Sequence, residues 1–310
     1  MSWTEANIPD LTGKTIVVTG ANSGLGLETT RLLSRRGAHI VMACRTQRKA
    51  EAAMQDVRNS NPDAKLEFMA LDLADLASVR AFAEAFGKAH DRLDVLLNNA
   101  GVMALPRTET ADGFEMQIGT NHFGHFALTS LLMPTLLETD GARVVQVSSL
   151  MHKVGSMRFD DLHGQRSYDK WRAYSQSKLA NLLFFYELHR RLSAAGAGVL
   201  SLAAHPGYSS TNLQGAGPKM TGSKLGERFW ALSNRVAAQP AWMGAMPSVF
   251  AAVGAPVESG AYYGPEGIGQ VRGYPVRVTS NRASQDEAAG KRLWEISVEA
   301  TGESFASVAR

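Results

Sequence analysis

Short apolar runs that alternate with helical patterns constrain the fold of this chain more than any other feature. The runs are nearly continuous in apolar residues, which is typical of strands that are buried on both faces of a parallel sheet. They lie at 14–20, 38–45, 66–73, 93–101, 142–149 and 198–207. The alternation predicts right-handed βαβ units and an α/β fold, with a single doubly wound parallel sheet of about seven strands flanked by helices.

Nothing in the sequence divides the chain into separate domains. It contains no internal repeat, low-complexity tract or Pro/Gly/Ser-rich linker, so we expect residues 1–310 to form one domain. Residues 208–250 lack strand character and are rich in Gly, Met and Trp. We interpret them as a helical excursion over one end of the sheet. They could form a substrate lid or a surface insertion whose aromatic residues pack on the core.

The composition excludes several classes of partner. The 32 basic residues nearly balance the 29 acidic ones, so neither the net charge of +3 nor any run of Lys and Arg favours a nucleic-acid partner. Cys44 is the single cysteine, which excludes an internal disulfide and a Cys-based cluster. Because the histidines show no metal-ligand spacing, no metal is expected.

The sequence also gives an expectation for the location of the protein. The chain begins without the basic segment and apolar run of a signal peptide, and no stretch approaches about 18 consecutive apolar residues. A single cysteine fits a reducing compartment. We therefore expect a soluble cytoplasmic protein with no transmembrane segment, and peripheral contact with a membrane remains open.

The segment "TGANSGLG" directly follows the first apolar run and opens a helical pattern. Its glycines permit a tight turn, and the N-terminus of the helix offers free N–H groups to a pyrophosphate. In this context the motif predicts a dinucleotide site, with a glycine-rich turn as the alternative. The residues predicted to contact the diphosphate are Gly20, Asn22, Ser23, Gly24, Leu25 and Gly26.

The end of the second predicted strand, "ACRTQRK", indicates which dinucleotide binds. An acidic side chain at this point would bind the adenosine ribose of NAD, but Cys44 and Arg45 stand there, followed by Arg48 and Lys49. A guanidinium group suits a 2′-phosphate, so NADP is favoured over NAD. The alternative is that these cations only solvate the start of the next helix.

The third and fourth predicted strands end in "LDL" and "NNAG". Ligands of doubly wound sheets bind at the carboxyl ends of the strands. Asp72 is therefore placed to accept a hydrogen bond from an adenine amino group, although it could instead cap a helix. Asn99, Ala100 and Gly101 would let the chain pass close to the cofactor, and Leu73 completes this part of the predicted site.

Together these motifs resemble the short-chain dehydrogenase/reductase superfamily, a Rossmann-fold family, over roughly residues 12–275. The matching segments, in the order of the family, are "TGANSGLG", "NNAG", "GTNHFGHF", "VVQVSS", "YSQSK" and "HPG". "YSQSKLANLLF" and "YYGPEGIGQVRG" are most similar to the retinol dehydrogenase and protochlorophyllide reductase-like branch, which is mostly NADP-dependent. The interval of 25 positions between Ser149 and Tyr174 is longer than in many members and indicates an insertion beside the active site, as occurs in that branch.

The resemblance implies that Tyr174 is the general acid/base, with Lys178 and Ser149 as its partners and Asn121 as the fourth catalytic residue. Tyr174 and Lys178 would stand one helical turn apart on the same face. Free tyrosine, with a pKa of about 10, is too weak an acid at neutral pH, and a nearby ammonium group would lower that value. The Ser149 hydroxyl could stabilise negative charge on the substrate oxygen.

The resemblance also places cofactor contacts elsewhere in the chain. Lys178, with Tyr174, would contact the nicotinamide ribose, and Asn121 would hold a water that links Lys178 to solvent. The Pro206–Gly207 turn would approach the nicotinamide carboxamide, with Thr211 near it or near the diphosphate. We interpret His205 as structural, because the proton-transfer role is already filled.

We therefore predict an NADP-dependent oxidoreductase that interconverts an alcohol with a ketone or aldehyde. The alternatives are an NADP-sensing regulatory protein, against which the complete set of catalytic residues argues, and a reductase of a carbon–carbon double bond. A lipophilic small-molecule substrate is suggested by apolar residues of the excursion, which could alternatively pack on the core: Phe229, Trp230, Trp242, Met243 and Met246. Members of the superfamily are commonly oligomeric, so a homodimer or homotetramer is expected.

Overall fold

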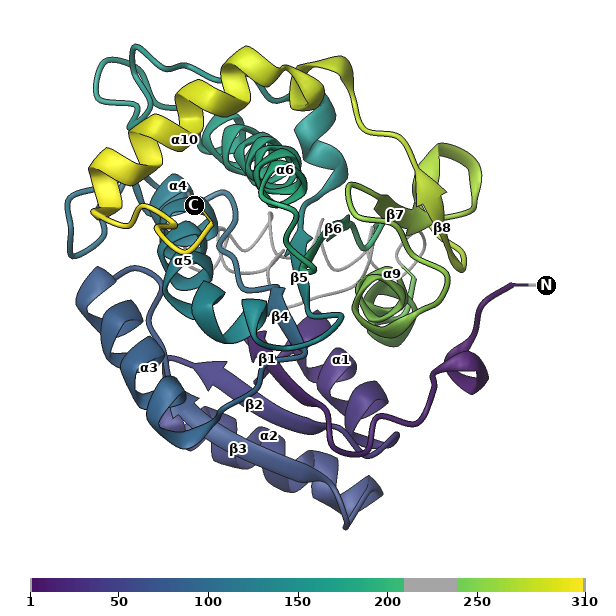
Figure 1. Ribbon diagram of the computed structural model, residues 1–310. Coiled ribbons are helices and arrows are strands. Elements are labelled where there is room, and N and C mark those ends of the chain that lie inside the picture. Colours follow the sequence, from purple (N-terminus) through teal and green to yellow (C-terminus); the bar gives the residue numbers. More distant parts are fainter. Residues whose placement is uncertain (1, 209–238, 309–310) are drawn as a thin grey trace.

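The computed structural model describes residues 2–208 and 239–308, and within them eight strands form one sheet in the order β3-β2-β1-β4-β5-β6-β7-β8 (Figure 1). All neighbouring strands from β3 to β7 are parallel, and only β8 pairs antiparallel, with β7. The strands are β1 (Thr15–Thr19), β2 (His39–Cys44), β3 (Lys65–Ala70), β4 (Val95–Asn98), β5 (Arg143–Val147), β6 (Leu200–Ala204), β7 (Tyr262–Pro265) and β8 (Pro275–Val278). The predicted doubly wound α/β fold is confirmed, with one strand more than expected.

Helices cover both faces of the sheet (Figure 1). The larger helices are α1 (Gly24–Ser34), α2 (Gln47–Ser60), α3 (Leu76–Ala89), α5 (Gly124–Leu137), α6 (Lys170–Ala194), α9 (Ala241–Val253) and α10 (Glu287–Thr301). Ile16 and Val18 of β1 lie in the core beneath α1, α2 and α9, whereas Val17 lies in the core beneath α3, α5 and α6. Successive residues of a strand point to opposite faces, so burial of both faces explains the continuous apolar runs.

Aspartate caps set the starts of two helices that matter for the site. The Asp169 carboxylate accepts hydrogen bonds from the N–H groups of Trp171 and Arg172, which places the start of α6 at Lys170. Asp75 caps α3 in the same way. A capping carboxylate satisfies N–H groups that have no partner within the helix.

A π-helical turn, Gly119–Phe123, lies between α4 (Met116–Ile118) and α5. Such a turn widens the helix locally and often marks a functional position. At its C-terminal side, a Cβ on Gly124 would lie 2.4 Å from the Leu73 carbonyl oxygen, so a larger residue would separate α5 from the loop after β3.

The predicted excursion at 208–250 lies mostly outside the described residues, including Phe229 and Trp230. Its described part contains the first turns of α9, where Met246 is fully buried in the core. Trp242, on the same helix, is 40% exposed. For Met246 the core-packing alternative therefore holds.

Candidate active site

A cleft of about 300 Å³ lies at the carboxyl ends of the central strands. Of the residues that the sequence predicted to bind the cofactor, those lining the cleft are Gly20, Asn22, Ser23, Leu25, Gly26, Arg45, Asp72, Leu73, Asn99, Ala100 and Gly101. The lining also includes Ala43, Cys44, Leu71, Val102 and Thr120. The other described residues that were predicted to bind the cofactor are not among those lining the cleft: Gly24, Arg48, Tyr174, Lys178, Pro206 and Gly207.

The glycine-rich turn has the shape that a pyrophosphate requires. Gly20 has a φ of +67°, a conformation that side chains disfavour. A Cβ on Gly26 would lie 2.4 Å from the Gly20 carbonyl oxygen, so only glycine lets α1 start this close to β1. Among the described residues, Ser23 forms no side-chain cap on α1. The first N–H groups of α1 can therefore bind an anion, and the turn fits a dinucleotide.

Cys44 supports this turn from the end of β2. Its buried sulfur accepts hydrogen bonds from the backbone N–H groups of Ala21 and Asn22. Burial raises the pKa of the thiol to about 11, so the thiolate is disfavoured. The side chain acts as a structural contact beside the cleft rather than as a nucleophile.

The adenosine end of the cleft carries opposite charges. The Arg45 side chain is 72% exposed, and its Nη1 lies 3.8 Å from Oδ2 of Asp72. The other carboxylate oxygen of Asp72 accepts a hydrogen bond from the Ala74 N–H at 3.0 Å. Asp72 thus holds a turn and faces Arg45, while Asp75 caps α3. Arg48 is exposed on the first turn of α2.

Ser149, Tyr174 and Lys178 come together beside the carboxyl end of β5. Ser149 forms a side-chain hydrogen bond with Tyr174 and also begins a 3₁₀ helix, η3 (Leu150–Val154). The Lys178 Nζ lies 5.9 Å from the centre of the Tyr174 ring and donates to the Val147 carbonyl oxygen at 3.2 Å. Tyr174 and Lys178 are only 6% and 4% exposed, so their chemistry is set by a nearly dry environment.

Asn121, in the π-helical turn, connects these residues to the cleft. Its Oδ1 accepts from the Val102 N–H at 2.8 Å, and its Nδ2 donates to the Val102 carbonyl oxygen and to Ser177 Oγ, each at 2.9 Å. A Cβ on Gly101 would lie 3.1 Å from Asn121 Oδ1 and 3.4 Å from Lys178 Nζ. Gly101 lines the cleft, so the two polar groups lie at its inner end.

These contacts limit how Asn121 could hold a relay water. Both hydrogens of its amide group are already donated within the protein. A water would have to donate to the second lone pair of Oδ1 or to the Asn121 main-chain carbonyl.

Burial dominates the acidity of the two central groups. It raises the pKa of Tyr174 to about 12, a rise that the hydrogen bond from Ser149 opposes, and it lowers the pKa of Lys178 to about 8. Lys178 is not among the groups that shift the Tyr174 pKa. The expected lowering of the tyrosine pKa by this lysine is therefore not seen in the protein alone, because a dry environment penalises both charged forms.

Thr19 and His125 support the site, and the sequence analysis did not single them out. Thr19 Oγ1 accepts from the N–H groups of Asn99 and Ala100, each at 2.9 Å, and lies 3.0 Å from His125 Nε2. The other ring nitrogen of His125 lies 3.0 Å from the Asn121 carbonyl oxygen. Because a carbonyl can only accept, that nitrogen carries the ring proton. The only sequence signal is the position of His125, one helical turn after Asn121.

The turn after β6 is held by His205. Its Nδ1 accepts from the Gly207 N–H at 3.2 Å, and its Nε2 pairs with Gln270 Oε1 at 3.2 Å. Burial lowers the pKa of His205 to about 3, so the ring is neutral. Gly207 has a φ of +64°, and a Cβ there would lie 2.3 Å from the Val271 carbonyl oxygen. Thr211 lies outside the described residues.

The segment between Ser149 and Tyr174 is anchored on the helix that carries the tyrosine. Gln176 of α6 donates to the Leu162 carbonyl oxygen at 3.0 Å and accepts from the Arg158 N–H at 2.9 Å. Asp161 accepts from three backbone N–H groups further along the segment and pairs with Arg158 at 3.2 Å. The segment between Ser149 and Tyr174 is thus an ordered loop that is hydrogen-bonded to α6 beside the catalytic residues.

Comparison with known proteins gives consistent matches. The profile of the short chain dehydrogenase family matches residues 14–221. Retinol dehydrogenase 13 from Homo sapiens is 42% identical over 305 residues, covering 96% of this chain and 86% of that protein. Retinol dehydrogenase 12 from Bos taurus is 41% identical over 294 residues, covering 94% of this chain and 87% of that protein.

Solved structures agree with these matches. A crystal structure of an uncharacterized protein from Mycobacterium Paratuberculosis has a TM-score of 0.81 and 42% identity, covering 98% of this chain and 99% of that one. A structure described as an NAD(P)-dependent gluconate 5-dehydrogenase from Beutenbergia cavernae, with bound NADP, has a TM-score of 0.60 and 25% identity, covering 79% of this chain and 92% of that one.

The relatives correct the expected location. A cytoplasmic location was inferred from the lack of a signal peptide and of a long apolar run, but the relatives that align over most of the chain are named for retinol, a lipid-soluble alcohol. The cytoplasmic prediction is therefore wrong, because those two features do not report attachment to a membrane surface. Within residues 2–208 and 239–308, no helix has the length and apolar character needed to cross a bilayer.

Proposed function

The chain belongs to the short chain dehydrogenase family, in its retinol dehydrogenase-like branch, and on that premise we propose that it is an NADP-dependent enzyme in which Tyr174 is the general acid/base. Membership makes it an oxidoreductase that uses a nicotinamide dinucleotide to interconvert an alcohol and a carbonyl compound. The finer assignments below are proposals, each supported by the geometry of particular residues.

The preference for NADP is supported by the end of β2. Cys44 occupies the position where an acidic side chain would favour NAD, and Arg45 follows it at the rim of the cleft. Arg45 is exposed and only loosely paired with Asp72 at 3.8 Å, so its guanidinium can turn toward a 2′-phosphate. When bound, the nicotinamide ring would exchange a hydride with the substrate.

Several residues would hold the rest of the cofactor. The glycine-rich turn would hold the diphosphate, while Tyr174 and Lys178 would contact the nicotinamide ribose. The Pro206–Gly207 turn would contact the carboxamide.

The proton chemistry follows from burial and hydrogen bonding. With a pKa of about 12, Tyr174 is a neutral phenol at physiological pH and can donate its proton to the oxygen of a carbonyl substrate. In the protein alone the Ser149 hydroxyl is bonded to Tyr174. By turning its one hydrogen toward the substrate oxygen, it would donate a second hydrogen bond there as negative charge develops. Lys178, with a pKa of about 8, can exchange protons near neutral pH and return one to Tyr174.

The observation that carries this proposal is the convergence of Ser149, Tyr174 and Lys178 beside Gly101, at the inner end of the cleft. The test is a spectrophotometric assay of NADPH oxidation against a panel of short and long-chain aldehydes and ketones, with product analysis to identify the reduced bond. Tyr174→Phe should lose at least about a hundredfold in kcat.

A matched control removes a hydroxyl from the same helix. Tyr186 bonds Ser280 through its hydroxyl at 2.8 Å, away from the cleft, so Tyr186→Phe should keep its activity. Full activity in Tyr174→Phe would refute the role of that tyrosine, and reduction of a carbon–carbon double bond would replace the proposed reaction.

We further propose that residues 1–310 act as one NAD(P)-binding domain, with 208–250 as the substrate lid, and that the substrate is lipophilic. The lipophilic substrate is supported by the retinol-named relatives and by Trp242, which is 40% exposed at the described edge of that segment. A homodimer or homotetramer remains a prediction, which light scattering of the purified protein would test.

A further inference from the structure

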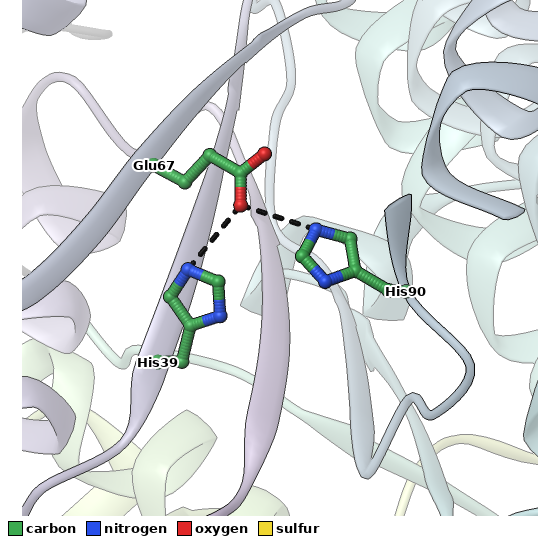
Figure 2. Close-up of side chains that lie close together, drawn as sticks. All are labelled: His39, Glu67 and His90. Atoms are coloured by element: carbon green, nitrogen blue, oxygen red, sulfur yellow. Dashed lines mark ion pairs between the residues drawn. The ribbon is translucent and has the colours of Figure 1, made fainter. Parts of the chain in front are cut away.

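Three side chains from separate elements, His39, Glu67 and His90, lie close together (Figure 2). His39 begins β2, whereas the cofactor cleft lies at the carboxyl ends of the strands. His39 is the first residue of β2, Glu67 lies in β3, and His90 directly follows α3. In the parallel pairing Glu67 lies opposite Val41, so Glu67 and His39 point to the same face of the sheet. The fold therefore brings two imidazoles and a carboxylate to one point.

The spacing of the three groups suits a metal ion. One carboxylate oxygen, Glu67 Oε2, lies 3.3 Å from His39 Nε2 and 3.1 Å from His90 Nε2. All three ligand atoms lie within 4.8 Å of one another. In a tetrahedral zinc site with bonds of about 2.0–2.1 Å, neighbouring ligand atoms lie about 3.3 Å apart. The separations of 3.3 and 3.1 Å are close to this value, and the third is at most 4.8 Å.

In the described part of the protein alone, one ring nitrogen of this cluster lacks a hydrogen bond. His90 Nε2 is buried and, among the described residues, has no hydrogen-bond partner, although it faces Glu67 Oε2. The ring of Phe86 packs on the His90 ring, with centroids 4.7 Å apart, which holds the imidazole in this orientation.

Lys65 lies beside His39 in the pairing of β2 with β3 and is a nearby cation that would oppose a metal ion. Its side chain is exposed and can turn toward solvent.

We propose that His39, Glu67 and His90 form a binding site for a divalent transition-metal ion, with Zn²⁺ as the best fit. Two imidazoles and one carboxylate select such ions over Mg²⁺ and Ca²⁺, which prefer oxygen ligands. The side chains of His39 and Glu67 are 31% and 35% exposed, which leaves room for a water as the fourth ligand.

The site would stabilise the fold rather than take part in the reaction. His39 and Cys44 mark opposite ends of β2, roughly 17 Å apart at the rise of a strand. A bound ion would join β2, β3 and the end of α3 without contacting the cofactor cleft. The linear sequence gave no metal-ligand spacing because the three ligands come from three elements.

The first test is calorimetric titration of the full chain, stripped with a chelator, with ZnCl₂. We expect one ion per chain with a Kd in the micromolar range or below, and no binding of MgCl₂. Glu67→Gln and His90→Gln should each weaken zinc binding at least about tenfold. The control His189→Gln alters a histidine of α6 that bonds Ser259, and it should leave the affinity unchanged. Absence of zinc binding in the parent chain, or equal binding in the Glu67 and His90 variants, would overturn the proposal.

A second test needs no variant and so does not depend on their folding. Zinc at about a hundred times its Kd should raise the Tm of the parent chain by about 5 °C, reversibly with chelator. Co²⁺ bound at the site should give the intense visible absorption of a tetrahedral complex. An unchanged Tm, or the weak spectrum of an octahedral cobalt ion, would contradict the site, whatever the outcome of the NADPH assays.

Discussion

The Lys178 ammonium lies 5.9 Å from the centre of the Tyr174 ring, yet burial and not this charge sets the acidity of the phenol. The pKa of Tyr174 is raised to about 12 and that of Lys178 is lowered to about 8. Of these two groups in the protein alone, the lysine thus titrates nearer to physiological pH, and the tyrosine stays protonated.

This relationship predicts different pH profiles for the two directions of the reaction. Carbonyl reduction uses the phenol, which is fully protonated well below pH 12, so its kcat/KM should not rise with pH. Alcohol oxidation needs the scarce phenolate, so its kcat/KM should rise by up to about tenfold per pH unit from neutral pH upward. Initial rates in both directions between about pH 6 and pH 10 test this, and parallel profiles would contradict it.

Replacement of the buried lysine should stabilise the protein while removing its activity. The folded-state pKa of Lys178, about 8, lies below its ordinary value of 10.5, so the folded state disfavours the ammonium form and stability rises with pH between these values. At pH 7 Lys178→Met should raise the free energy of unfolding by about 1–3 kcal/mol, less whatever the hydrogen bond to Val147 contributed. The carbonyl-reduction rate should fall at least about a hundredfold.

Urea unfolding measures the stability change, with Lys88→Met as control. Lys88 is 73% exposed and pairs with Glu84 on the surface, so its loss should change stability by less than about 0.5 kcal/mol. If Lys178→Met is less stable than the parent chain at neutral pH, the inferred cost of burying the ammonium is wrong.

Buried histidines should make the protein sensitive to acid. Burial lowers the pKa values of His122, His125 and His205 to about 3, 4 and 3. Below about pH 6.5 the unfolded chain binds protons that the folded chain does not, so stability is lost progressively as the pH falls toward 4. Each pKa unit corresponds to about 1.4 kcal/mol, which makes the combined loss several kcal/mol.

A single variant tests this origin of the acid sensitivity. His122 lies in the core with only Nε2 bonded, to Ser297, and its Nδ1 has no partner among the described residues. His122→Asn removes one titrating group, so the drop in Tm between about pH 7 and pH 4.5 should be smaller than in the parent chain. An equal drop in both proteins would show that other groups cause the acid sensitivity.

The sheet could be predicted from the sequence because a strand that is buried on both faces consists almost entirely of apolar residues. Ile16, Val17 and Val18 are all fully buried, and together they make a continuous apolar run. The cofactor motifs line the cleft because parallel strands bring their carboxyl ends to one edge. β8 has no continuous apolar run, because it begins with Pro275 and contains Arg277, which is exposed at the edge of the sheet.

Other features depend on contacts between distant segments and leave no local pattern. The π-helical turn that carries Asn121 is tied by two hydrogen bonds to Val102. The balance of pKa values between Tyr174 and Lys178 depends on how completely the fold buries both side chains. The spacing of residues in the sequence therefore predicts neither the π-helical turn nor these pKa values. It also does not predict that His39 and His90 lie close together.

The choice of cofactor should depend on one exposed side chain. Arg45→Ala should raise the KM for NADPH by about ten- to a hundredfold, the loss of roughly 1.4–3 kcal/mol of charge-assisted hydrogen bonding, and leave the KM for NADH nearly unchanged. Stability should change little, because the Arg45 side chain is 72% exposed and lies 3.8 Å from Asp72. Arg48→Ala, on the exposed first turn of α2, is the matched control and should have the smaller effect on the KM for NADPH. Equal losses with both cofactors in Arg45→Ala would mean that Arg45 shapes the cleft without recognising the 2′-phosphate, and the preference for NADP would then need another origin.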